Sequence, residues 1–184
     1  MMKLIRYLLW IFPLFAFVQQ PNDEYYFTNN GIVSFRSEAR QELIKASSNH
    51  MRGVLDPQKR TFVFKVVIRT FEGFNSALQQ EHFNEKYLES EKYPEATFSG
   101  KVIEDIDLTI NGTYDIRSKG KLKIHGKEME RIIRCIVTVE NGAVKVESHF
   151  TILLSDHNIK VPKVVHEKIA SEIFVDIEAT LIKK

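Results

Sequence analysis

The side chains best suited to chemistry lie in one polar segment near the middle of the chain. His82, Glu85 and Glu89 follow one another at i, i+3 and i+7, so a helix would place one imidazole and two carboxylates roughly along one face. Zinc and other divalent ions take such ligands. The spacing is not the HExxH of a metalloprotease, and exposed helix faces are ordinarily charged. We therefore predict no metal site in this segment.

Two other places in the chain offer reactive side chains. Asp156 and His157 are adjacent and suit acid–base work, but no serine or cysteine in a nucleophile context accompanies them. Cys135 is the only cysteine, which excludes an intramolecular disulfide and a cysteine zinc site. On a strand, a lone thiol is most often a small buried hydrophobe. The sequence thus predicts no catalytic residue, no cofactor and a protein that is not an enzyme.

The polar segment itself has the signature of a capped helix. Ser76 can accept hydrogen bonds from first-turn N–H groups while Gln79 reaches back, which is a capping box, and Asn75 is a rival cap. Pro94 marks the end of the helix. The helix carries an apolar stripe made of Leu78, Phe83, Tyr87 and Leu88. This pattern predicts a helix that lies with its stripe against the rest of the protein.

On both sides of this helix the sequence alternates between apolar and polar residues, which is typical of β-strands. The clearest run is 60–71, which places Phe62, Phe64, Val66 and Ile68 on one face. Further strands are predicted at 31–39, 41–48, 51–55, 96–102, 106–110, 113–118, 121–124, 131–139, 144–154 and 173–181. Asn141-Gly142 favours a type I′ turn between two of them. A short helix is predicted at 163–171.

These elements predict a mainly β fold. Each strand has one apolar and one mixed face, so the apolar faces must meet around a common interior. We expect an antiparallel, lipocalin-like barrel of about eight strands, with one helix covering part of it and one short helix before the last strand. A barrel of this size holds packed side chains or one small ligand.

Length, charge and the first residues define the organisation of the chain. Its 184 residues suffice for one domain. Residues 1–20 have a basic start and an apolar run of about twelve residues, which is typical of a signal peptide and too short for a membrane span. We predict a linker at 21–30, a single domain at 31–184 and a periplasmic or secreted location. Without Lys3 and Arg6 the basic residues fall from 26 to 24 and equal the acidic ones, which disfavours nucleic-acid binding.

Four stretches of sequence resemble a known family. They are QEHFNE at 80–85, YLES at 87–90, KYPEATFSG at 92–100 and GKLKIHG at 120–126. Together they resemble the YceI-like family of exported, lipocalin-like proteins, and the resemblance covers residues 32–181. It implies an antiparallel barrel partly closed by the helix. It also implies an apolar ligand in the lumen, since some members bind polyisoprenoid chains or quinone-like lipids.

Patterning alone leaves two interpretations of the inward phenylalanines open, because they either line a cavity or fill the barrel solidly. The resemblance favours a cavity. We therefore predict an exported protein that holds an isoprenoid or other long-chain lipid, with a homodimer as a further expectation. The predicted ligand-binding side chains are Phe62, Phe64, Val66, Ile68, Leu78, Phe83, Phe98, Val137, Val146, Phe150, Val175 and Ile177. The alternative is a non-enzymatic envelope interaction or stress protein with a packed barrel, whose docking surface is the acidic helix face of Glu81, Glu85 and Glu89.

Overall fold

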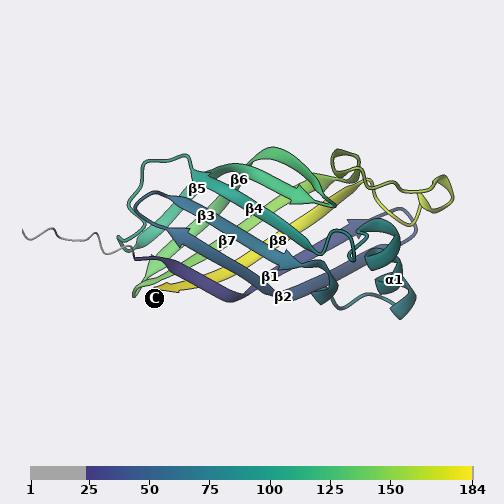
Figure 1. Ribbon diagram of the computed structural model, residues 1–184, viewed down its shortest axis with the longest axis horizontal. Helices are drawn as coiled ribbons and strands as arrows, with labels where there is room; N and C mark the ends of the chain where they lie inside the picture. The colour runs from purple at the N-terminus through teal and green to yellow at the C-terminus, as the bar shows by residue number, and fades with distance from the viewer. Residues whose placement is uncertain (1–23, 184) are drawn as a thin grey trace, which may run out of the picture.

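The computed structural model describes residues 24–183, which form a closed barrel of eight antiparallel strands. Figure 1 shows the strands wound around one long axis. They are β1 (Tyr26–Glu38), β2 (Leu43–Asp56), β3 (Thr61–Val67), β4 (Glu95–Val102), β5 (Gly112–Ile124), β6 (Lys127–Glu140), β7 (Ala143–Leu153) and β8 (Glu172–Lys183). Each strand pairs with its neighbours in sequence, and β8 pairs with β1. The predicted fold class is confirmed; the predicted signal peptide lies outside the described residues.

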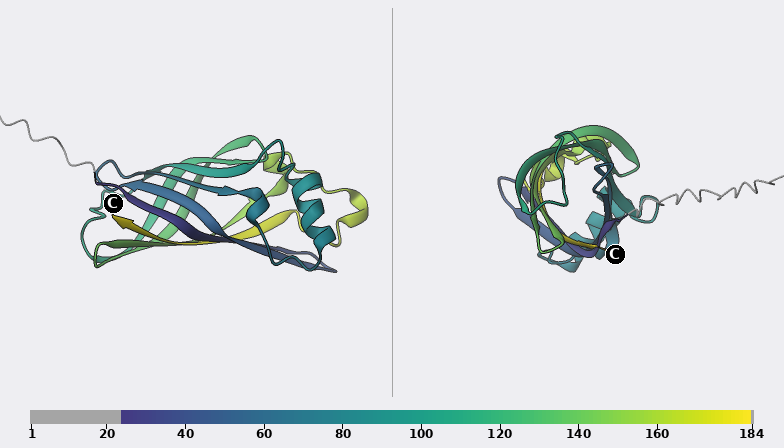
Figure 2. Two further views of the ribbon diagram at one scale, coloured as in Figure 1. Left: turned by 60° about the horizontal axis from the view of Figure 1, so that its bottom comes forward. Right: turned by 90° about the vertical axis from the view of Figure 1, so that its left-hand side faces the viewer.

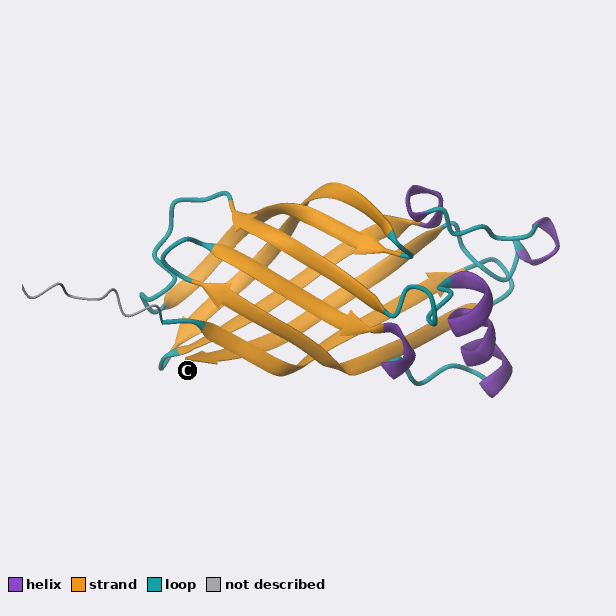
Figure 3. Ribbon diagram, in the orientation of Figure 1, coloured by secondary structure: helices purple, strands orange, loops and turns teal. Residues whose placement is uncertain are grey.

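The helical segments gather at one end of the barrel, as Figure 3 shows in purple. Between β3 and β4 lie a 3₁₀ turn η1 (Ile68–Thr70), the helix α1 (Ala77–His82) and a π-helical turn η2 (Phe83–Tyr87). Between β7 and β8 lie two 3₁₀ turns, η3 (Leu154–His157) and η4 (Lys163–Val165). No helix among residues 24–183 is long and apolar enough to cross a membrane. We call the end that holds these helical segments the open end of the barrel, and the end that holds the C-terminus the closed end.

The strand boundaries differ from the sequence prediction in several places. The strand predicted at 60–71 ends at Val67, where η1 follows. β5 is one strand where two were expected, at 113–118 and 121–124. β1 begins at Tyr26, ahead of the predicted start at Gly31, so the second half of the predicted linker is strand. β2 is continuous where two strands were expected. Residues 106–110, whose alternation predicts a strand, form part of a loop instead. Their alternation has a different cause, because Leu108 turns into the closed end and is almost completely buried.

The helix begins as predicted and ends earlier. The Ser76 side chain accepts a hydrogen bond from the Gln79 N–H at 3.2 Å, and the Gln79 side chain accepts one from the Asn75 N–H at 3.1 Å, which is a capping box shifted by one residue. The Leu88 N–H donates to the Phe83 carbonyl at 2.9 Å, a bond across five residues that widens the last turn. Pro94 does not set the end of the helix. Glu89 does, because its backbone is left-handed with φ of 44°.

The short helix predicted at 163–171 is only the 3₁₀ turn η4, followed by turns. Val164 and Val165 are β-branched and lose side-chain freedom in a helix, so the segment has little to extend it. The β6–β7 hairpin is confirmed in detail: Asn141 and Gly142 have φ of 51° and 76°, the two positive values that a type I′ turn requires.

Side chains pack closely at the closed end, whereas several inward side chains farther along the barrel are only partly buried. Buried side chains from five elements meet around Leu108 at the closed end, namely Tyr26, Val102, Val139, Val144 and Leu181. Toward the open end, inward side chains such as Phe64, Phe98, Phe150 and Ile177 are only partly buried. The right-hand view in Figure 2 looks along the barrel from the closed end. The ladder between β6 and β7 also stops early, running from Glu140 and Ala143 only as far as Ile136 and Glu147.

Candidate functional site

The barrel encloses an apolar cavity of about 480 Å³. Its floor is formed near the closed end by Leu55, Val102, Leu108 and Ile116. Inward residues of all eight strands line its walls, and α1 and η2 cover part of its mouth at the open end (Figure 2). The volume lies within the range of about 300–1,000 Å³ found for small-molecule sites. Inward phenylalanines that remain only partly buried are consistent with this space, because each lacks protein atoms on one side.

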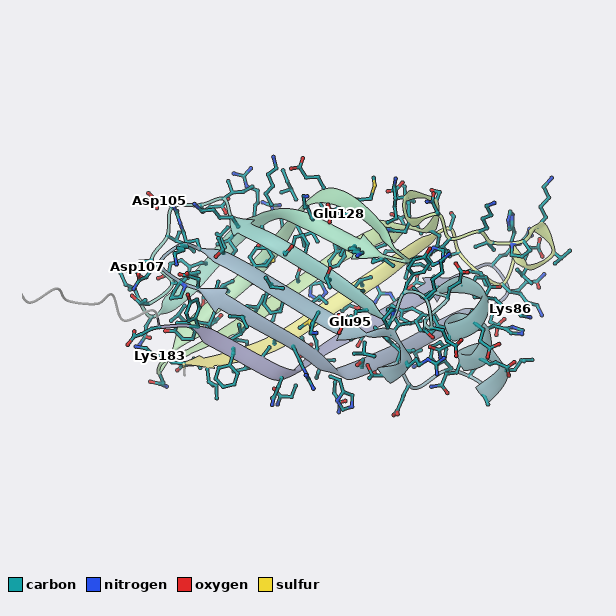
Figure 4. The ribbon with its side chains drawn as sticks, in the orientation of Figure 1. Lys86, Glu95, Asp105, Asp107, Glu128 and Lys183 are labelled. Carbon is teal, nitrogen blue, oxygen red and sulfur yellow. The ribbon has the colours of Figure 1, made fainter. Side chains whose placement is uncertain are left out.

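Charged side chains are kept to the mouth and the outer surface. Among the described lining residues, Glu42 and Lys168 lie near the mouth, and Lys65 is exposed and paired with Glu95 at 2.9 Å. Figure 4 shows Asp105, Asp107 and Lys183 around the closed end and Lys86 beside α1, all outside the barrel. A charge buried deep in such a cavity without a partner would be costly. The cavity is therefore suited to a ligand that is apolar over most of its length.

Eleven of the twelve predicted ligand-binding residues line this cavity. They are Phe62, Phe64, Val66, Ile68, Phe83, Phe98, Val137, Val146, Phe150, Val175 and Ile177. Leu78 does not, since its side chain is 57% exposed on the outer face of α1. Successive helical residues turn by about 100°, so Leu78 lies roughly 140° from Phe83 around the helix. Gln79 and His82 occupy the inward face instead. Contact between these residues and a ligand stays a prediction.

Four phenylalanines form a cluster beneath α1, and only Phe83 among them is a predicted ligand-binding residue. Phe83 stacks on Phe35 with ring centroids 5.3 Å apart, and it also contacts Phe71 and Phe74 at 5.7 and 5.1 Å. All four line the cavity. The alternation of β1 already placed Phe35 on the inward face. Phe71 ends the predicted strand 60–71 out of phase with its inward residues, and Phe74 carries no strand pattern; both follow η1. The cluster makes the covering of the mouth apolar on its inner side.

Polar contacts hold α1 and its flanking segments to the rim of the barrel. The Gln79 side chain donates to Glu42 at 2.5 Å, and that of Gln80 donates to the Phe71 carbonyl at 3.0 Å. Farther along, Glu89 pairs with His125 of the β5–β6 turn at 2.6 Å, while the other ring nitrogen of His125 lies 3.0 Å from the His157 carbonyl. One histidine therefore connects three segments that are distant in sequence.

The same contacts separate the residues considered for a metal site. Glu89 turns to His125, whereas the His82 ring lies 2.9 Å from Lys86. Among residues 24–183 no three histidine, cysteine or acidic side chains are grouped in a way that could hold a metal ion. His82 contributes to the cavity lining near the mouth.

His157, considered with Asp156 for acid–base chemistry, is fully buried in η3 and does not line the cavity. Its Nδ1 lies 3.2 Å from the Lys127 carbonyl, and its Nε2 has no hydrogen-bond partner among the described residues. Burial lowers the pKa of His157, and this outweighs the opposing effect of the Lys127 carbonyl. A neutral, enclosed imidazole is expected to pack η3 against β6.

The middle of the wall contains three small polar side chains that sequence reasoning missed as a group. Ser118 of β5, Cys135 of β6 and Ser148 of β7 are buried and line the cavity. Each sits at an inward position of its strand, between apolar residues. That placement was visible in the sequence, since a polar residue that keeps the alternation must face the interior.

Comparison with known proteins gives a consistent picture. A family model described as a YceI-like domain matches residues 30–181. No curated protein matches the chain. A polyisoprenoid-binding domain from Saccharophagus degradans, implicated in plant cell wall breakdown, has a similar structure, with a TM-score of 0.73, 12% identity and coverage of 87% of this chain and 98% of that one. BcnA of Burkholderia cenocepacia has a TM-score of 0.67, 16% identity and coverage of 82% and 95%. A YceI protein of Campylobacter jejuni has a TM-score of 0.54, 15% identity and coverage of 98% and 99%.

Proposed function

Since this chain belongs to the YceI-like family, whose model matches residues 30–181, we propose that it is an exported protein that binds one long-chain apolar lipid inside its barrel. The ligand is an isoprenoid chain or a lipid of similar length, such as a quinone with an isoprenoid tail. The observation that carries this proposal is the apolar cavity of about 480 Å³. A structurally similar protein is described as a polyisoprenoid-binding domain, which agrees with it.

The energy of binding comes from burying the chain of the ligand. A chain of about fifteen carbons, at about 0.8 kcal/mol for each buried methylene, contributes roughly 12 kcal/mol. Association costs at least about 4 kcal/mol in lost freedom. The remainder of about 8 kcal/mol corresponds to a dissociation constant near the micromolar range. A lipid of this length therefore binds without any charged contact, which fits walls that hold few polar groups.

The alternative function, an interaction protein with an acidic docking face on the helix, required a packed barrel. The cavity argues against that requirement. Glu89, one of its three acidic residues, is also engaged with His125. We therefore favour lipid binding.

Native mass spectrometry of the protein purified from its own host tests the proposal. We expect one dominant lipid adduct that organic solvent extracts and that has the mass of an isoprenoid or comparable chain. A purified protein that carries no lipid, and that also fails to bind added geranylgeraniol, would refute the proposal. Cell fractionation separately tests export.

A further inference from the structure

A small polar cluster interrupts the apolar wall of the cavity at mid-height. It consists of Ser118, Cys135 and Ser148, which come from the three neighbouring strands β5, β6 and β7 and are 5%, 8% and 5% exposed. The Ser118 oxygen lies 3.8 Å from the Cys135 sulfur. Ser148 sits where the β6–β7 ladder stops. We call these three residues the mid-wall cluster.

The hydrogen bonds of the cluster leave one strong donor poorly used. Ser148 donates to the Arg134 carbonyl at 2.6 Å, so its proton is committed and its oxygen can still accept. Cys135 has a long contact of 3.8 Å to the Ile133 carbonyl. Ser118 has only the sulfur as a partner among the described residues, and sulfur is a weak acceptor. A buried hydroxyl without a good partner destabilises the fold.

Other buried serines differ, because each has an oxygen or nitrogen partner. Ser37 accepts from the Ala170 N–H at 2.9 Å, Ser48 lies 2.6 Å from the Thr70 hydroxyl, and Ser90 accepts from Arg69 at 3.2 Å. Those three hydroxyls connect parts of the protein to one another. Ser118, which lines the cavity as Ser37 does, has no oxygen or nitrogen partner among the described residues, so a ligand or a water molecule can supply one.

We propose that the mid-wall cluster is a binding subsite for one neutral oxygen of the ligand, a hydroxyl or a carbonyl. This inference rests on the proposed lipid-binding function and specifies the chemical class of the lipid. Ser118 donates to the ligand oxygen, and a ligand hydroxyl can donate in turn to Ser148. A phosphate or carboxylate does not suit this level, since the described charged lining residues, Glu42, Lys65 and Lys168, lie at the mouth or on the outer surface.

The test compares two probes that differ in a single oxygen: geranylgeraniol and the hydrocarbon in which hydrogen replaces its hydroxyl. The affinity of each for the full chain is measured by displacement of the fluorescent probe N-phenyl-1-naphthylamine. A neutral hydrogen bond contributes about 0.5–1.5 kcal/mol, so we expect Ser118→Ala to weaken geranylgeraniol by about 2- to 12-fold. The affinity for the hydrocarbon should stay the same or rise. Ser48→Ala, which removes a buried hydroxyl away from the cavity, should leave the ratio of the two affinities unchanged.

The outcomes separate the subsite from the function. If both probes bind but Ser118→Ala leaves their affinity ratio unaltered, the subsite is wrong and lipid binding stands. If neither probe binds to the wild-type protein, the proposed function fails and the subsite fails with it. Thermal unfolding checks that the variant folds. Should Ser118→Ala not fold, Ser118→Cys keeps the side-chain size, replaces the strong donor with a weak one, and is expected to shift the ratio in the same direction.

Discussion

Substituting a larger side chain into the cavity tests whether the barrel contains free space or is packed solidly. Val146 and Val144 lie two residues apart on the inward face of β7. Val146 lines the cavity and is partly buried, whereas Val144 is 0% exposed in the closed end and does not line it. The same substitution, valine to phenylalanine, therefore meets free space at one position and packed atoms at the other. This makes Val144→Phe a matched control for Val146→Phe.

The expected effects have opposite signs. Phenylalanine adds about four carbons to valine, which is worth roughly 3 kcal/mol at about 0.8 kcal/mol each. At position 146 these carbons occupy ligand space, so the affinity for geranylgeraniol should fall by up to roughly 200-fold. The free energy of unfolding should stay the same or rise. At position 144 overpacking should lower the free energy of unfolding by about 1–3 kcal/mol.

Urea unfolding followed by circular dichroism measures stability, and displacement of N-phenyl-1-naphthylamine measures affinity. The result that refutes the reasoning is specific. If Val146→Phe loses as much stability as Val144→Phe and binds the alcohol as well as the wild type does, the space at Val146 is neither empty nor used by the ligand.

Three further predictions follow from single contacts. Because burial lowers the pKa of His157, its neutral form is favoured in the fold. Stability should therefore be full above about pH 6.5, the usual pKa of histidine, and should fall as the pH drops below it. This loss should be smaller in His157→Asn when urea unfolding is measured above and below that pH. Burial also raises the pKa of the Cys135 thiol, so methyl methanethiolsulfonate should modify this thiol more slowly in the folded protein than in urea. Bound geranylgeraniol should slow the reaction further. Equal rates with and without the lipid would contradict a thiol that faces the cavity. In Gly126→Ala the new Cβ would lie 2.4 Å from the Tyr93 ring at a φ of +71°, which should lower the free energy of unfolding by about 1–3 kcal/mol. Gly142→Ala has a similar φ and nothing within 4 Å of the new Cβ, so it should lose less stability. Thermal unfolding of both variants measures the difference.

Strand periodicity predicted most of the barrel because it is a local property. Phe62, Phe64 and Val66 alternate with polar residues, and only a pleated strand puts all three on one face. The same alternation correctly predicted which residues of β6, β7 and β8 line the cavity. It also failed locally, since the alternation around Leu108 came from a loop that turns one apolar side chain into the closed end.

The features that were not predicted depend on contacts between distant residues or on a change in helical period. The orientation of α1 puts Gln79, not Leu78, against the cavity, and the π-helical turn η2 changes the helical period after α1. Glu89 meets His125 across 36 positions, and no spacing rule joins them. Ser118 and Ser148 were visible as inward polar residues, but which residues they lie beside follows from the registers of the β5–β6 and β6–β7 pairs.

The early end of the β6–β7 ladder has a mechanical consequence. Beyond Ile136 and Glu147, two side-chain bonds to the backbone span these strands, from Ser148 to the Arg134 carbonyl and from Arg131 to the Thr151 carbonyl at 2.8 Å. Two isolated side-chain hydrogen bonds resist separation of the strands less than a continuous ladder does, so we expect the barrel wall to deform more easily here, beside the cavity. The floor around Leu108 has no such freedom, because packed side chains enclose it. For the proposed lipid ligand, we therefore expect the cavity to accept a wider chain more readily than one that would have to displace the floor.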